Sequence, residues 1–149
     1  MLRVARVSLL LLLGVAPACH RDEVIPPQAS KRWSEMDRAE RSAHMSKVVE
    51  PTMRAAFQAH DPERFADFGC ATCHGEGAKD GTFAMPNPAL LHLPRWGFRR
   101  KVYVPHREMV RFMWGTVQPK MAEQLGMQEW RWTRRDGFGC RACHVHDDH

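Results

Sequence analysis

A five-residue motif, Cys-x-x-Cys-His, occurs twice in this chain of 149 residues and constrains it more than any other feature. The first copy covers residues 70–74 (CATCH) and the second covers residues 140–144 (CRACH). Each copy follows a Phe-Gly pair. Two thiols three residues apart, followed directly by an imidazole, bring three reactive side chains within one turn of chain. The sequence therefore predicts two cofactor or metal sites of the same kind.

The spacing matches the motif that attaches c-type haem. Two thiols at this separation reach the two vinyl groups of one haem and form thioethers, and the next residue then lies beneath the iron. We therefore predict two haem c groups. The predicted attachment residues are Cys70, Cys73, Cys140 and Cys143, and the predicted proximal iron ligands are His74 and His144.

Three other uses of paired cysteines were weighed. A structural zinc site made from two such pairs usually has about 15 to 20 residues between them, whereas Cys140 lies 67 positions after Cys73. A thioredoxin-like redox pair needs a βαβ pattern that this sequence lacks. Two disulfides in an exported domain remain open, although they would not explain a histidine after both pairs.

The N-terminus predicts export. Residues 1–18 combine Arg3 and Arg6 with a short apolar run and end in small residues directly before Cys19. This resembles a bacterial lipoprotein signal, which implies a lipid on Cys19 and a domain on the periplasmic side of a membrane. The residue directly after Cys19 is His20 rather than Asp, and in such lipoproteins this implies sorting to the outer membrane. Ordinary cleavage near Ala18 and an uncleaved anchor are the alternatives. Loss of residues 1–18 lowers the formal net charge from +5 to +3, too mild to indicate nucleic acid.

The mature chain is predicted to be a tether over 19–33 and one domain over 34–149. Capping residues and prolines predict helices over 34–49, 51–59 and 105–117, with a restart over 119–125. A further helical piece is expected from Asp61 into the first motif, with loops over 75–100 and 126–139. No pattern of period two stands out, so the predicted fold is all-α with long loops.

An internal repeat links the two motifs. The pattern Met-x3-Val-x-Pro-x-Met-x3-Phe/Leu occurs at 45–57 and again at 113–125, an offset of 68 residues. Phe-Gly-Cys-x-x-Cys-His occurs at 68–74 and 138–144, an offset of 70. We interpret these as two pseudo-repeated units, about 34–100 and 101–149.

On these motifs the sequence resembles di-haem c-type cytochromes of bacterial envelopes. The arrangement of a methionine on a helix upstream of Cys-x-x-Cys-His looks like that of one haem unit of the photosynthetic reaction-centre cytochrome subunit. In that unit the upstream methionine is the sixth iron ligand. The resemblance carries this role to Met53 and Met121. The alternative is that both are core residues of an amphipathic helix. Met85, in a Met-Pro pair similar to the ligand loop of small cytochromes c, is the rival. Histidine ligation would use His44, His60, His92 or His106.

The resemblance implies a periplasmic electron carrier rather than an enzyme, whose partners are redox proteins of the envelope. The alternative is a haem enzyme or sensor in which one open-coordinate haem binds a gas or peroxide. Basic residues form two groups that could pair with haem propionates or dock an acidic partner. They are Arg95, Arg99, Arg100 and Lys101, and Arg131, Arg134 and Arg135.

Overall fold

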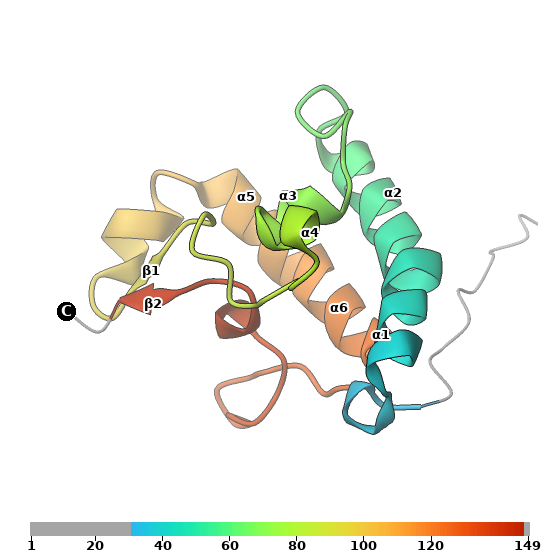
Figure 1. The fold of residues 1–149 in the computed structure, drawn as a ribbon. Helices are drawn as coiled ribbons and strands as arrows, with labels where there is room; N and C mark the ends of the chain where they lie inside the picture. The colour runs from blue at the N-terminus through green and yellow to red at the C-terminus, as the bar shows by residue number, and fades with distance from the viewer. Residues whose placement is uncertain (1–30, 148–149) are drawn as a thin grey trace, which may run out of the picture.

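The structure, a computed structural model, describes residues 31–147 (Figure 1). The predicted signal peptide, Cys19 and residues 19–30 of the predicted tether lie outside the described residues. The described elements are α1 (Arg38–His44), α2 (Glu50–His60), α3 (Cys70–His74), α4 (Gly77–Asp80), β1 (Leu93–Pro94), α5 (Arg107–Phe112), α6 (Gln118–Gln124) and β2 (His146–Asp147). π-helical turns cover Met45–Val49, Arg99–Tyr103 and Met113–Val117, and 3-10 turns cover Trp33–Glu35 and Cys140–Ala142.

The first long helix runs through α1, a π turn and α2 without a break. The helix was predicted over 34–49 with Ser34 as its cap, but Asp37 caps it: the Asp37 side chain accepts from the Glu40 amide at 2.9 Å, and the Glu40 carboxylate accepts from the Asp37 amide at 3.0 Å. Pro51 was predicted to start or kink a separate piece. The helix instead continues because the wider π turn immediately precedes the proline, which has no amide hydrogen to donate.

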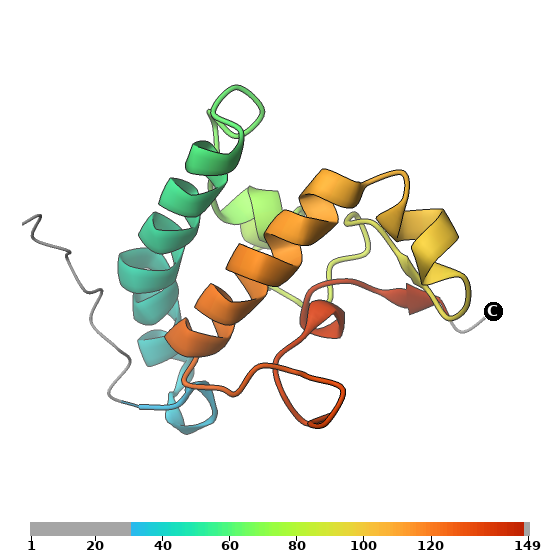
Figure 2. The same ribbon diagram turned by 180° about the vertical axis from the view of Figure 1, so that it is seen from behind.

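The second long helix runs through α5, a π turn and α6, and it lies antiparallel to the first (Figure 2). Its π turn, Met113–Val117, again immediately precedes an x-Pro pair, 68 residues after the equivalent turn of the first helix. The same irregularity therefore occurs at equivalent positions of the repeated sequence pattern.

The core lies between these two helices. Its larger cluster of buried side chains is Val49, Met53, Phe57, Phe68 and Phe112. The Phe57 ring lies 4.8 Å from the Phe68 ring and 4.9 Å from the Phe112 ring. A second cluster, Ala122, Leu125 and Phe138, continues the core toward the end of α6.

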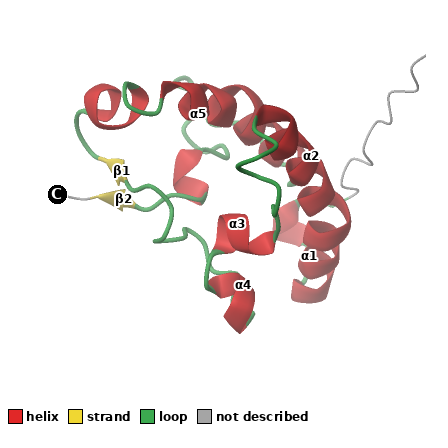
Figure 3. Cartoon of the chain, turned by 90° about the horizontal axis from the view of Figure 1, so that it is seen from above, coloured by secondary structure: helices red, strands yellow, loops and turns green. Residues whose placement is uncertain are grey.

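The predicted all-α fold is wrong, because the described chain contains a small parallel sheet. β1 pairs with β2 in the register Leu93↔His146 and Pro94↔Asp147, and the two strands lie at the end of the molecule away from α1 and α2 (Figure 3). The Leu93 amide donates to the Val145 carbonyl at 2.8 Å. Strands of two residues cannot show a period of two, so the sequence pattern could not reveal them.

Two further segments differ from the predicted helices and loops. The helix predicted from Asp61 into the first motif is absent over residues 61–69, where the Asp61 side chain accepts from the Arg64 amide at 3.0 Å and closes a turn. The predicted loop 75–100 instead contains α4, β1 and the beginning of a π turn. Within residues 31–147, no helix is both long and apolar enough to cross a membrane.

Candidate functional site

The first motif forms α3, which begins after Gly69 in an extended conformation. The Thr72 hydroxyl accepts from the Gly69 amide at 3.1 Å and fixes the start of this turn. Cys70 is exposed and Cys73 is partly buried. Because residues three apart share one face of a helix, both thiols lie on the same side of α3.

The second motif forms a tighter turn with a similar entry. Gly139, which precedes the 3-10 turn Cys140–Ala142, has φ −149° and ψ −173°, close to the values of −164° and −169° at Gly69. A side chain at Gly139 would meet Trp130, since its Cβ would lie 2.9 Å from the Trp130 Cβ. Both thiols of this motif, Cys140 and Cys143, are partly buried.

All four motif cysteines are free thiols in the structure. Burial raises the pKa of Cys73 to about 11, with a smaller contribution from Cys70. Burial raises the pKa of Cys143 to about 12, with smaller contributions from Cys73 and Cys140. Both thiols are protonated at neutral pH.

Asn87 joins the two motifs directly. It is buried, with 4% of its surface exposed. Its side-chain amide donates to the Cys73 carbonyl at 2.8 Å, and its backbone amide donates to the Cys143 carbonyl at 2.9 Å. Its side-chain oxygen accepts from the Ala89 amide at 2.9 Å. One residue therefore fixes the spacing of the two motifs.

The two motif histidines have different surroundings. Nδ1 of His144 lies 2.9 Å from the Leu91 carbonyl. A histidine whose Nδ1–H donates in this way keeps a lone pair on Nε2 for a metal. Nδ1 of His74 is buried, with no hydrogen-bond partner among the described residues. Burial lowers the pKa of His74, an effect that the nearby Phe83 backbone partly opposes.

Met53 and Met121 face the core beside their respective motifs. Met53 is 3% exposed and belongs to the larger cluster, against which Cys73 also packs. Met121 is partly buried and packs against both clusters, as does Met45, and Cys143 packs against the second cluster. Each predicted distal methionine therefore shares a cluster with the second cysteine of its own motif. Met85, the rival, is partly buried in the loop before Asn87.

The histidines weighed as alternative ligands have other contacts. Nε2 of His44 lies 2.7 Å from the Gln124 carbonyl, and the His60 ring stacks on Phe112 with a centroid distance of 4.0 Å. Both ring nitrogens of His92 have oxygen partners within 3.0 Å. His106 is exposed just before α5.

Two site residues escaped the sequence analysis besides Asn87. The Glu50 carboxylate lies 3.8 Å from Sγ of Cys70, and the Gln118 side-chain oxygen lies 3.9 Å from Sγ of Cys140. The two occupy equivalent positions of the repeat, each directly before its proline. Comparing the two repeats position by position would have found this pair.

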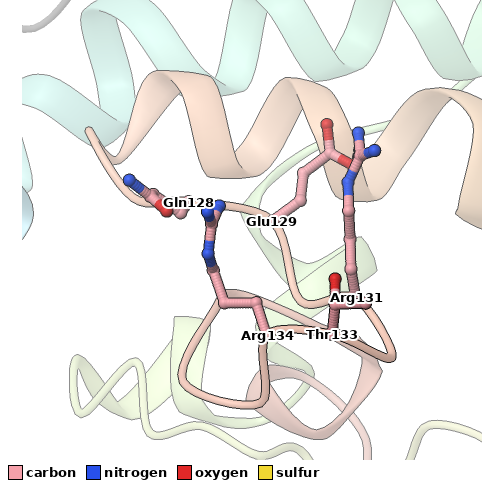
Figure 4. Close-up of a pocket in the computed structure, with 5 residues that line it drawn as sticks. All are labelled: Gln128, Glu129, Arg131, Thr133 and Arg134. Carbon is pink, nitrogen blue, oxygen red and sulfur yellow. Dashed lines mark hydrogen bonds and ion pairs between the residues drawn. The ribbon is translucent and has the colours of Figure 1, made fainter.

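Within residues 31–147, no group of three or more His, Cys, Asp or Glu side chains is arranged to hold a metal ion. A cleft of about 470 Å³ lies in the loop before the second motif (Figure 4). Its lining residues are Gln128, Glu129, Arg131, Thr133 and Arg134.

Comparison with known proteins yields no relative: no family model, no curated protein and no solved structure matches this chain.

Proposed function

We propose that this chain is a di-haem c-type cytochrome that carries electrons on the periplasmic side of a bacterial membrane, anchored by a lipid on Cys19. The observation that carries the proposal is the close placement of two Cys-x-x-Cys-His motifs, joined through Asn87. Their cysteines are unpaired thiols, as thioether formation requires. The residues present therefore fit two covalently attached haems.

Each motif would hold one haem through its own side chains. Cys70 and Cys73 would form the thioethers of the first, and Cys140 and Cys143 those of the second. His74 and His144 would supply the proximal imidazoles. The Leu91 carbonyl would orient the His144 ring and increase its basicity. The buried Nδ1 of His74 has no hydrogen-bond partner within the described residues, so no comparable bond would orient the His74 ring.

The distal positions would be filled by Met53 and Met121, because each lies in the apolar cluster that contacts its own motif. When bound, each haem supplies a one-electron couple between ferric and ferrous iron. A thioether ligand favours the ferrous state relative to a second imidazole and so raises the reduction potential. The surrounding phenylalanines exclude water from Met53.

Optical spectroscopy tests this proposal on the full chain, exported from a host that attaches c-type haem. We expect a reduced spectrum typical of c-type haem that carbon monoxide does not change, because one histidine and one methionine would occupy the two ligand positions that the porphyrin leaves on each iron. A carbon monoxide shift in the unmodified protein would favour the ligand-binding or peroxide-reducing alternative. Absence of a haem spectrum would overturn both.

Three matched variants test the ligands. Met53→Leu and Met121→Leu keep the volume but remove the thioether, so each is expected to open one haem to carbon monoxide. Met45→Leu, on the same helix stripe, is the control and is expected to leave both haems closed. If all three variants bind carbon monoxide to the same extent, Met53 and Met121 are not the distal ligands. Met85→Leu would then be the next variant to test.

A further inference from the structure

The segment between β1 and α5 concentrates positive charge. Residues 93–107 contain five Lys and Arg side chains and no Asp or Glu. We define the basic aromatic patch as Arg95, Trp96, Arg99, Arg100 and Lys101. Among residues 31–147, none of its four cations forms an ion pair. Uncompensated charge of one sign attracts a surface of the opposite sign.

The same patch exposes large apolar side chains. Trp96 is 75% exposed, and the neighbouring Val104 and Leu91 are 52% and 46% exposed. The Arg95 guanidinium lies over the Trp96 ring, 5.8 Å from its centroid. Exposed Trp and Arg side chains in one place are typical of the residues that dominate binding energy in protein interfaces.

The patch is held in place by the core and by the second motif. Val102, within the π turn Arg99–Tyr103, is 3% exposed, and the Phe98 ring lies 6.0 Å from that of Trp114. β1, which ends one residue before the patch, pairs with β2, which begins two residues after His144. The Leu91 carbonyl, which contacts the His144 ring, lies in the same chain segment, four residues before Arg95. The patch is therefore fixed relative to His144.

The other basic group is less suited to this role. Arg131 lies 3.5 Å from the Glu129 carboxylate, and Asp136 directly follows Arg135. Acidic neighbours therefore reduce the net charge of the loop that contains Arg131, Arg134 and Arg135. It has the same number of removable positive charges as Arg99, Arg100 and Lys101, which makes it a matched control.

We propose that the basic aromatic patch docks the acidic surface of a redox partner protein and so brings that partner close to the haem of the second motif. This inference rests on the proposed function. An anionic membrane surface would also attract cations and tryptophan. A protein is favoured because the patch adjoins the segment that holds His144, and a redox partner, unlike lipid, must approach that site.

Electron exchange with an acidic flavin-containing carrier protein, a flavodoxin, tests the inference. The exported chain carries Cys19→Ser, so that no lipid anchor contributes. Reduction by the flavodoxin hydroquinone is followed by stopped flow over a range of salt concentrations, and binding is measured separately by calorimetry. The test variant is Arg99→Gln/Arg100→Gln/Lys101→Gln, and the control is Arg131→Gln/Arg134→Gln/Arg135→Gln.

We expect the test variant to react about tenfold more slowly at low salt and to lose most of its salt dependence. The control, which loses the same net charge, should change by about twofold or less. Trp96→Ala should weaken binding without changing the salt dependence. Equal effects of the two triple variants, or no effect of either, would overturn the inference.

Two further outcomes separate this inference from the proposed function. Patch-dependent binding by a chain without haem would overturn the function but leave the docking surface. Patch-dependent binding to phosphatidylglycerol vesicles, with flavodoxin kinetics unchanged in the test variant, would assign the patch to a lipid surface and overturn the inference.

Discussion

Asn87 shows how one side chain can organise two sites. It is buried, and its amide nitrogen, side-chain nitrogen and side-chain oxygen each have a backbone partner. Gly75, at φ +56°, leaves room for the Asn87 side chain because it has no Cβ. A Cβ at this position would lie 2.9 Å from the Asn87 side-chain nitrogen. A buried polar residue whose groups are all paired specifies one arrangement of the segments that it joins.

Asn87→Ala is therefore expected to lower the free energy of unfolding by about 1–3 kcal/mol, because the Cys73 carbonyl loses its buried donor. Asn87→Asp keeps the acceptor for the Ala89 amide but not the donor, and should be destabilising too. Chemical denaturation measures both, with the exposed Gln128→Ala as control. Changes below about 0.5 kcal/mol in both variants would contradict the assigned role.

At this scale the sequence predicts what local spacing encodes. The motif cysteines and histidines were predicted because their chemistry depends on residues three and four positions apart. Asn87 could not be predicted, since its two carbonyl partners, Cys73 and Cys143, meet it only in the folded chain. An asparagine between Pro86 and Pro88 indicates only a turn.

At the scale of elements, prolines and short strands account for the differences between expectation and structure. The prolines at 51 and 119 were expected to interrupt helices, but a π turn before each lets the helix continue. The strands form because β1 and β2 lie alongside one another after folding, and their two-residue length gives no local signal.

Gly137 is a critical position in the loop before the second motif. A Cβ there would lie 2.4 Å from the backbone of both Glu129 and Trp130, and backbone cannot move aside like a flexible side chain. Gly137→Ala should therefore destabilise the domain by roughly 2–3 kcal/mol and reduce haem loading of the second motif more than the first.

The matched control is Gly115→Ala, because a Cβ there meets nothing within 4 Å. It lies within a helical segment, so alanine should stabilise the domain by roughly 0.5–1 kcal/mol. Thermal unfolding and the haem content of each variant check both expectations. A Gly137→Ala protein as stable as the unmodified chain would contradict the close approach of Gly137 to the backbone of Glu129 and Trp130.

His92 predicts a pH dependence of the strand pair. The Pro88 carbonyl and then the Asp147 carboxylate raise the pKa of His92 above its usual value of about 6.5. Protonated His92 therefore stabilises the folded state. This contribution is fully present below pH 6.5 and is lost as the pH rises through the folded-state pKa of His92.

Because the His92 ring is exposed, the effect should be small. The difference in melting temperature between the unmodified chain and His92→Gln should be largest near pH 5 and disappear by about pH 8. A difference that grew with rising pH would contradict the assigned hydrogen bonds.

At the scale of the whole molecule, the described chain is two antiparallel helices that hold the two motifs beside a shared core. The helices were predictable from capping residues and repeated apolar spacing, but the π turns that let them continue through the prolines were not. The approach of the two motifs was not predictable either, because it depends on long-range bonds such as that between Asn87 and Cys143. The two methionines proposed as distal ligands were only partly predictable. The helical periodicity predicts that Met53 is buried, but a core residue with no ligand role would be buried in the same way.

The most direct test of the account is the intact mass of the exported chain, combined with a haem count by pyridine haemochrome. The account predicts a mass higher than that of the polypeptide by two haem groups. Cys140→Ala/Cys143→Ala should retain one haem, and Cys70→Ala/Cys73→Ala should retain the other. A mass equal to that of the bare polypeptide, with no haem absorption, would contradict it and return the four cysteines to disulfide or metal chemistry.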